Sequence, residues 1–180
     1  SKGIVSIKTI IKLHIYNPIF IFSQKEDSWE SKYINKLKTL QSKKIKLFVT
    51  KDFSFKNFKK KIKSESVDII FAIGWRRILE KKIIDYALIK SFVMHDSLLP
   101  KNRGFAPLNW AIINNEKKTG VSLIAIDKLV DTGNIYLQDS VMIKKKDDIN
   151  TLNSKILKIY TKILIKFFRN IEFYLRNSIN

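Results

Sequence analysis

The sequence contains no cysteine and only two histidines, His14 and His95, among its 180 residues. Without thiol groups the chain can form neither a disulfide framework nor a thiolate metal site. The two histidines lie far apart in the sequence, so a histidine-rich metal centre is not expected either. The sequence therefore predicts a function that uses no metal ion.

Long hydrophobic runs and targeting signals are also missing. No segment reaches the roughly 18 uninterrupted apolar residues of a membrane-spanning helix, and no signal peptide opens the chain. Hydrophobic residues nevertheless make up 45% of the sequence, which indicates a globular rather than a disordered chain. We expect one domain over residues 1–180, with a sizeable core and a cytoplasmic location.

Acidic residues are scarce. The chain has 16 Asp and Glu against 35 Lys and Arg, which gives a formal net charge of +19. Such a charge is found in proteins that bind nucleic acid, anionic membranes or phosphorylated substrates. Here the basic residues are mostly Lys and are spread along the chain, whereas a nucleic-acid surface is usually clustered and rich in Arg. The pattern favours solvated Lys faces, and the charge alone does not select a function.

Apolar runs of strand length alternate with amphipathic stretches along the chain. Helices are predicted over residues 3–13, 27–40 (capped by Asp27 or Ser28), 53–63, 77–87, around Trp110 from Pro107 onward, and 148–176. Strands are predicted over residues 18–23, 45–49, 67–74 and 89–95, followed by 120–127 and 134–143 without a helix between them. The alternation indicates an α/β fold with a mainly parallel sheet flanked by helices, and the last two strands should pair with a different geometry.

The two ends of the chain carry further expectations. The tripeptide SKG at residues 1–3 lies directly before a helix and resembles the turn after a strand, so the first strand of the fold is expected to be missing from this sequence. Near the other end, a polar stripe at steps of three and four faces apolar residues on the predicted helix 148–176. We expect this helix to pack on the domain with a solvated Lys face, in preference to lying on a membrane surface.

Three segments at the ends of predicted strands have an unusual chemical composition. They are GWRRIL at 74–79, HDSLLPKNRG at 95–104 and DKLVDTG at 127–133. Each has a plain structural explanation, since the first could be packing, the second a core histidine and the third a turn. Ligands of parallel α/β sheets, however, bind beyond the carboxyl ends of strands. A histidine near a carboxylate there forms an acid–base pair suited to amine chemistry.

The pattern HxSLLPxxRGxxPxxW at 95–110, followed by TGV at 119–121 and DTG at 131–133, resembles the formyltransferases that use 10-formyltetrahydrofolate. This family includes methionyl-tRNA formyltransferase, glycinamide ribonucleotide transformylase and the sugar N-formyltransferases. The resemblance extends over residues 67–143. It implies a Rossmann-like formyltransferase fold and 10-formyltetrahydrofolate as the formyl donor.

The resemblance implies a role for each matched position. His95 corresponds to the catalytic histidine, which stabilises the oxyanion and protonates the departing folate nitrogen, and Asp131 to the aspartate that orients it. The remaining implied residues bind the folate ring (Trp75, Arg76, Arg77, Ile78, Leu79, Asp127 and Val130) or shape and cap the loop at the site (Ser97, Pro100, Arg103 and Gly104).

One position departs from the family pattern. The family has Asn two residues before the catalytic histidine, where it donates to the formyl oxygen, and this chain has Val93. Loss of one oxyanion donor commonly costs about 10²–10³ in rate. We expect an active branch that dispenses with the Asn, against a catalytically degenerate homologue that still binds folate or nucleotide.

The acceptor is expected to be a primary amine on a small molecule. The spacing of Asp127 and Asp131 and the Arg103-Gly104 pair resemble the tRNA and sugar branches, and the chain ends in a helix where the tRNA enzymes continue into a β-rich domain. A nucleotide-linked amino sugar is therefore the expected acceptor, with tRNA as the alternative, and a homodimer is compatible with the sequence. A plain nucleic-acid-binding module stays open, whereas a nicotinamide enzyme is disfavoured because no GxGxxG occurs.

Overall fold

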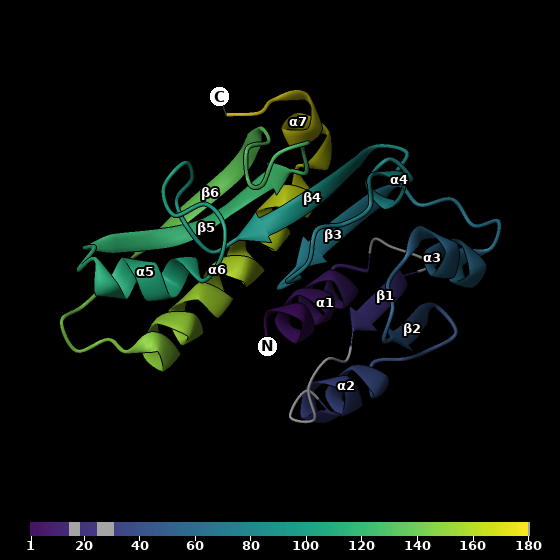
Figure 1. The fold of residues 1–180 in the computed structure, drawn as a ribbon, viewed down its shortest axis with the longest axis horizontal. Coiled ribbons are helices and arrows are strands. Elements are labelled where there is room, and N and C mark those ends of the chain that lie inside the picture. The colour runs from purple at the N-terminus through teal and green to yellow at the C-terminus, as the bar shows by residue number, and fades with distance from the viewer. Residues whose placement is uncertain (15–18, 25–30, 180) are drawn as a thin grey trace.

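The computed structural model describes residues 1–14, 19–24 and 31–179, which form helices and strands in an α/β arrangement (Figure 1). The helices are α1 (Lys2–Lys12), α2 (Ser31–Lys38), α3 (Phe55–Ile62), α4 (Lys81–Ile84), α5 (Pro107–Ile113), α6 (Ile149–Arg169) and α7 (Ile171–Arg176). The strands are β1 (Ile19–Gln24), β2 (Ile45–Thr50), β3 (Ile69–Ile73), β4 (Lys90–His95), β5 (Lys118–Ala125) and β6 (Ile135–Met142).

The described strands form two sheets. β1 and β2 pair in parallel, while the second sheet has the order β3-β4-β5-β6. Within it β3 and β4 are parallel, and β5 pairs antiparallel with both β4 and β6. The predicted α/β class is confirmed, and so is the different pairing of the last two strands.

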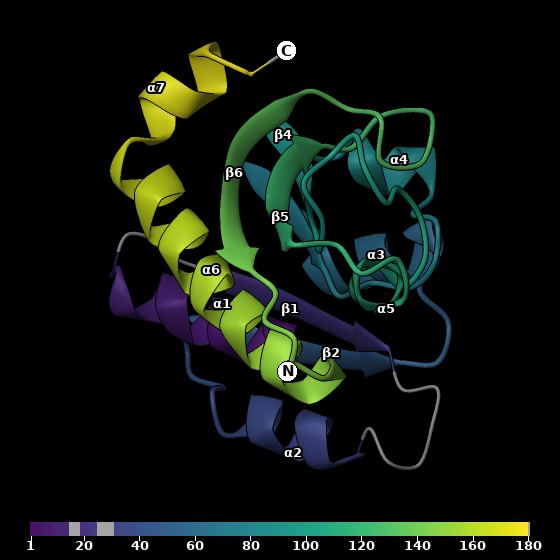
Figure 2. The same cartoon turned by 90° about the vertical axis from the view of Figure 1, so that its left-hand side faces the viewer.

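The main core lies between the four-stranded sheet and α6, which runs along one face of it beside α1 (Figure 2). Fully buried residues of α6 recur every three or four positions, namely Leu152, Ile156, Tyr160, Leu164 and Phe167. Lys158, Lys162 and Lys166 of the opposite stripe are exposed, and Lys162 contacts Asp139 of β6 at 2.7 Å. The expectation that this helix packs on the domain is confirmed.

Two predicted helices differ from the observed ones. The helix predicted over 77–87 is reduced to α4, because residues 76–78 are exposed and offer no apolar face to bury. Glu80 instead accepts a hydrogen bond from the Phe55 amide and ties this loop to α3. The helix predicted over 148–176 is interrupted at Asn170, whose non-helical backbone (φ −131°, ψ 39°) separates α6 from α7. The predicted caps Asp27 and Ser28 lie outside the described residues.

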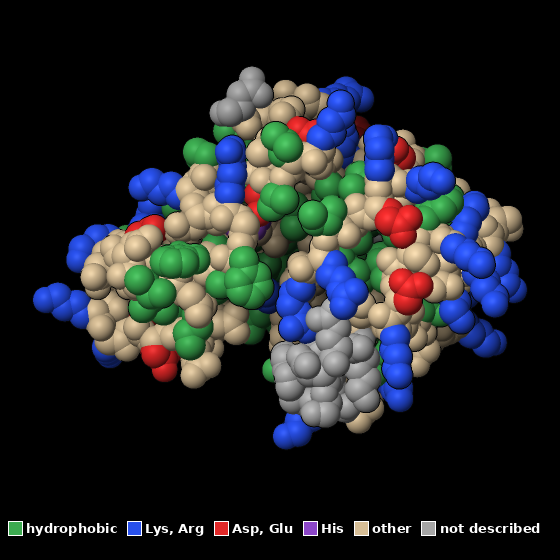
Figure 3. Space-filling view, viewed as in Figure 1, with side chains coloured by type: hydrophobic (Ala, Val, Ile, Leu, Met, Phe, Trp, Pro, Cys, Tyr) green, Lys and Arg blue, Asp and Glu red, His purple; other side chains and the backbone are tan. Residues whose placement is uncertain are grey.

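The surface of the described residues is basic and mostly polar. In Figure 3 the Lys and Arg side chains are spread across the visible face, with hydrophobic side chains between them. Among the helices of the described part of the chain, none is both long and apolar enough to cross a membrane.

Candidate active site

His95 is the last residue of β4, and it is buried with 8% of its surface exposed. Its Nδ1 lies 3.3 Å from Oδ2 of Asp131, which belongs to the loop after β5. Its Nε2 lies 2.8 Å from the backbone carbonyl oxygen of Asn102. The fold therefore places the two residues implied as catalytic within hydrogen-bond reach of each other.

Asp131 is held in place by its own backbone and by the loop after β4. Its φ of +54° lies in the left-handed region, which Asp tolerates better than most residues. Its Oδ2 also accepts a 2.9 Å hydrogen bond from the amide of Gly104, whose φ is +86°. The carboxylate consequently joins the two loops that follow β4 and β5.

Both ring nitrogens of His95 face hydrogen-bond acceptors. A neutral imidazole carries a proton on only one nitrogen, so it can donate to only one of them at a time. The imidazolium can donate to Asp131 and to the Asn102 carbonyl together. The two contacts therefore orient the ring from both sides.

A buried polar network supports the loop that follows His95. The Ser122 hydroxyl donates to the carbonyl of Ser97 and accepts from the amide of Leu99, at 2.6 and 3.1 Å. Gln138 of β6 donates to Ser122 Oγ and to the Leu99 carbonyl, at 2.8 and 2.9 Å. Ser97 donates in turn to the Lys101 carbonyl at 2.6 Å. Sequence reasoning missed Ser122 and Gln138, although a serine inside the apolar strand GVSLIA was a signal of a polar role.

Sequence reasoning also missed Asn102. Its φ is +53°, and its side-chain amide donates to Glu116 at 2.9 Å. These two constraints orient the Asn102 carbonyl toward His95. The backbone of this residue, which no sequence pattern reveals, is thus a direct partner of the histidine ring.

Asp96 anchors the end of β4 on the other side. Its carboxylate pairs with Lys2 of α1 and lies 2.7 Å from the Tyr160 hydroxyl of α6. Burial raises the pKa of Tyr160, and the nearby charge of Asp96 raises it further, so the phenol stays protonated and donates. This contact links α6 to the strand that carries His95.

The segment 74–79, implied to bind the folate ring, lies at the end of β3. Trp75 is half-buried with its ring centroid 4.8 Å from that of Phe53, and its buried Nε1 has no hydrogen-bond partner among the described residues. Arg76 and Arg77 are exposed, and with Trp75 and Leu79 they line a large cavity between β1 and β3. His95 and Asp131 are not part of that lining, so the implied site residues fall into two groups.

The other implied residues lie on loops. Asp127 and Val130 are exposed, as are Pro100 and Arg103. Large apolar side chains on the loops after β3, β4 and β5 are unusually exposed, with values of 87% for Ile78, 80% for Phe105, 71% for Leu129 and 57% for Val130. Exposed apolar residues on neighbouring loops are typical of a surface that binds a ligand.

Val93 lies between apolar strand neighbours, opposite Ala72 on β3 and Ile124 on β5. Its side chain is half-buried and offers no hydrogen-bond donor. The oxyanion donor two residues before His95 is therefore absent from this chain.

Gly133 is essential for the path of the loop that carries Asp131. A Cβ at this position would lie 1.9 Å from the Ala125 carbonyl oxygen, whereas a Cβ at Gly3 of α1 meets nothing within 4 Å. Gly133→Ala is expected to destabilise the protein by about 1–3 kcal/mol, as overpacking does. Gly3→Ala, the matched control, should stabilise it by roughly 0.5–1 kcal/mol because alanine is the better helix former. Thermal unfolding of both variants measures this, and equal stabilities would contradict the close approach at Gly133.

The described helices and strands form an α/β fold in which His95 and Asp131 lie within hydrogen-bond reach of each other. The sequence matches the formyl transferase family over residues 12–168, and the chain belongs to that family. Among the described residues, no group of three or more His, Asp or Glu side chains is arranged to hold a metal ion.

Several known proteins are similar to this chain. It is 34% identical over 177 residues to the bifunctional polymyxin resistance protein ArnA of Wigglesworthia glossinidia brevipalpis, covering 98% of this chain and 25% of the relative. It is 39% identical over 110 residues to the methionyl-tRNA formyltransferase of Thermodesulfovibrio yellowstonii, covering 61% of this chain and 36% of the relative. The chain thus spans only a quarter to somewhat over a third of the length of these relatives.

Solved structures share the fold. Phosphoribosylglycinamide formyltransferase from Bacillus halodurans superposes with a TM-score of 0.76 at 21% identity, covering 94% of this chain and 91% of the other. The formyltransferase PseJ from Anoxybacillus kamchatkensis, solved with UDP-4,6-dideoxy-4-formamido-L-AltNAc and tetrahydrofolate, gives a TM-score of 0.64 at 23% identity, covering 90% of this chain and 80% of the other.

Proposed function

We propose that this chain transfers a formyl group from 10-formyltetrahydrofolate to a primary amine, with His95 and Asp131 as the catalytic pair. The observation that carries this proposal is the 3.3 Å contact between His95 Nδ1 and Asp131 Oδ2 at the carboxyl ends of neighbouring strands. Membership of the formyl transferase family supports it.

The reaction proceeds through a tetrahedral intermediate. The amine lone pair attacks the formyl carbon, a C–N bond forms, and the carbonyl electrons move to oxygen. The His95 ring donates a hydrogen bond to this oxyanion, and the Asp131 carboxylate keeps the ring oriented. The bond from carbon to the folate nitrogen then breaks with its electron pair on nitrogen, which takes the His95 proton. The proton lost by the attacking amine returns to the His95–Asp131 pair.

Substrate must compete for the proton on Nε2. In the structure that nitrogen faces the Asn102 carbonyl at 2.8 Å, so the formyl oxygen reaches it only by displacing or sharing this contact. We propose that the 101–103 turn moves to allow this. Such tightening of catalytic hydrogen bonds on substrate binding is common.

The folate ring binds between the loops after β3 and β5. Trp75, Arg76, Arg77, Ile78 and Leu79 form one side, with the unpartnered Trp75 N–H as a donor, and Asp127 and Val130 form the other. The exposed apolar residues on these loops provide contact area for a flat ring. PseJ, which shares this fold, was solved with tetrahydrofolate bound.

A nucleotide-linked amino sugar is the proposed acceptor. A small pocket of about 220 Å³ beside Asp96 is lined by Lys2, Asn109, Asn150 and Asn153, side chains that hydrogen-bond well to sugars and phosphates. The sugar nucleotide in the PseJ complex supports this choice. Methionyl-tRNA is the second candidate, because relatives at 34–39% identity are methionyl-tRNA formyltransferases and the net charge is +19.

The test is an assay of the purified chain with 10-formyltetrahydrofolate and three acceptors: a panel of nucleotide-linked amino sugars, glycinamide ribonucleotide and methionyl-tRNA. We expect formylated product with an amino sugar, and a turnover that depends on both substrates. Product only with methionyl-tRNA, at a rate falling steeply with salt, would assign the second candidate. Absence of product with all acceptors, together with measurable folate binding, would identify a degenerate homologue.

A further inference from the structure

One ring nitrogen of His95 is occupied by the protein itself. Its Nε2 lies 2.8 Å from the backbone carbonyl oxygen of Asn102. A carbonyl oxygen only accepts, so the Nε2–H is the donor in this contact. The formyl group of the proposed donor offers an oxygen of the same kind, a neutral carbonyl. The two oxygens compete for one hydrogen, and the group that holds the Asn102 carbonyl in place influences the outcome.

The conformation of Asn102 is held by a contact from outside its loop. Its φ of +53° lies in the left-handed region, which Asn reaches more easily than most residues but which still costs energy. Its side-chain amide donates to Oε1 of the half-buried Glu116 at 2.9 Å. Because the side chain and the carbonyl belong to the same residue, this hydrogen bond also holds the carbonyl toward His95.

The end of α5 fixes the position of Glu116. Asn115 follows the helix with a φ of +52°, and its amide donates to the Ile112 carbonyl at 3.0 Å. The Glu116 amide donates to the Ala111 carbonyl at 2.9 Å. These two hydrogen bonds form a Schellman motif, which satisfies the last carbonyls of a helix. Ala111 is fully buried, so the backbone of Glu116 is tied to the core and its carboxylate is a fixed acceptor for Asn102.

The Asn102 contact lowers the affinity for a formyl donor. A formyl oxygen that binds Nε2 replaces an equivalent acceptor, so the usual net gain of a neutral hydrogen bond is lost. The same carbonyl is displaced when the oxyanion forms, so the bound donor and the transition state carry the same cost. Tetrahydrofolate has no formyl oxygen and carries no such cost. The contact therefore changes the preference of the site between the formylated and the unformylated folate.

We propose that Glu116 is a positioning residue that sets the affinity of this site for the formyl donor. It acts through the side chain of Asn102, which it holds so that the Asn102 carbonyl stays on Nε2 of His95. The inference rests on the proposed formyl transfer, because it takes the formyl oxygen as the competing acceptor.

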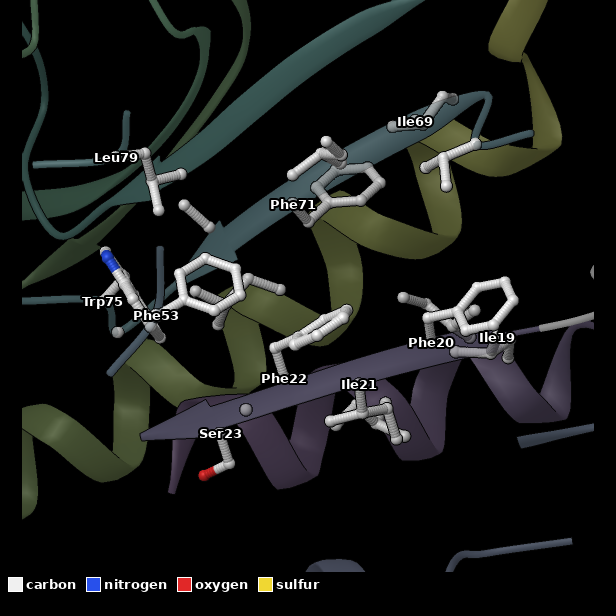
Figure 4. A pocket seen from close by; sticks show the side chains of 18 of the residues that line it. Ile19, Phe20, Ile21, Phe22, Ser23, Phe53, Ile69, Phe71, Trp75 and Leu79 are labelled. Atoms are coloured by element: carbon white, nitrogen blue, oxygen red, sulfur yellow. The ribbon is translucent and has the colours of Figure 1, made fainter. Parts of the chain in front are cut away.

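The contribution of the formyl group can be measured separately from that of the folate ring. Figure 4 shows Trp75 and Leu79 at the wall of the large cavity, and His95, Asn102 and Glu116 are not part of that lining. A change at Glu116 therefore leaves the proposed ring-binding segment intact. Tetrahydrofolate is the matched control ligand, since it carries the ring and lacks the formyl oxygen.

The test measures the affinity of the chain for both ligands without an acceptor. Glu116→Ala is expected to bind 10-formyltetrahydrofolate about 3–10-fold more tightly, the worth of one neutral hydrogen bond, with the affinity for tetrahydrofolate unchanged. Glu116→Gln keeps an oxygen that accepts from Asn102 and should bind both ligands like the parent. Glu172→Ala, at an exposed position of α7, controls for the loss of one negative charge.

A second measurement requires no ligand. His14 and His95 are the two histidines of the chain, so NMR of protein with isotope-labelled histidine resolves the His95 ring. The Nε2 signal of His95 should move in Glu116→Ala and stay in place in Glu116→Gln. Asn102→Gly, which retains access to a positive φ, should reproduce the Glu116→Ala result. The double variant should add nothing further, because both changes remove the same contact.

Three results would overturn the proposal. An equal change in affinity for both ligands would mean that Glu116 only stabilises the loop. Weaker binding of 10-formyltetrahydrofolate by Glu116→Ala would mean that the contact helps to hold the donor. An unchanged His95 Nε2 signal in Glu116→Ala would mean that the Asn102 carbonyl does not depend on Glu116. Absence of binding of either ligand by the parent would instead overturn the proposed function, and the Nε2 signal alone would then decide the positioning role.

Discussion

His95→Ala is expected to lower the rate of formyl transfer by about 10²–10⁴-fold, the range that a positioned general acid supplies. The His95 ring donates to the oxyanion and protonates the leaving nitrogen in the proposed reaction, and no other histidine lies in the described site. Single-turnover kinetics with saturating 10-formyltetrahydrofolate measures the effect on the chemical step. His14→Ala, at an exposed position in the turn after α1, is the matched control and should leave the rate unchanged.

Asp131→Asn removes the negative charge of the side chain while nearly keeping its shape. Asn also tolerates a positive φ, and its side-chain oxygen can still accept from the Gly104 amide. The loop should therefore remain folded, while the imidazolium loses its counter-charge and the rate falls by about 10²-fold or more. Equal rates for the parent and for both the His95 and the Asp131 variants would contradict the catalytic pair and favour a degenerate binding protein.

Val93→Asn is expected to raise the rate of formyl transfer by about 10–10²-fold. An oxyanion donor is commonly worth about 10²–10³ in rate, and a donor introduced without evolved support should recover part of that. Val93 is half-buried on the strand that ends at His95, so an Asn side chain there can point to the site without being fully enclosed.

Val93→Ala is the control, because it removes the same apolar contacts and adds no donor. Both variants should lose about 1–3 kcal/mol of stability or less, which thermal unfolding checks. A rate increase shared by Val93→Ala would indicate relief of crowding instead of a new hydrogen bond. A Val93→Asn rate at or below the parent value would mean that another group already donates to the formyl oxygen.

Patterns local in sequence predicted most of the secondary structure. The period of the apolar residues in α6 was visible because one face of a helix recurs every three to four positions. The alternation of apolar runs and amphipathic stretches likewise indicated the α/β class. The helix predicted over 77–87 was wrong because amphipathic spacing alone does not show whether a segment has a surface to pack against, and residues 76–78 do not.

The sequence by itself determined the family of this protein and predicted its chemistry: the motif from His95 to Gly104 and the Asp131-Thr132-Gly133 turn predicted a formyl-transfer pair, and Val93 predicted the loss of one donor. Only the tertiary structure decided how that pair is held, because its partners are backbone groups and residues distant in sequence. The Asn102 carbonyl, the Gly104 amide and the Ser122–Gln138 network depend on loop conformation and strand register, which no local pattern encodes.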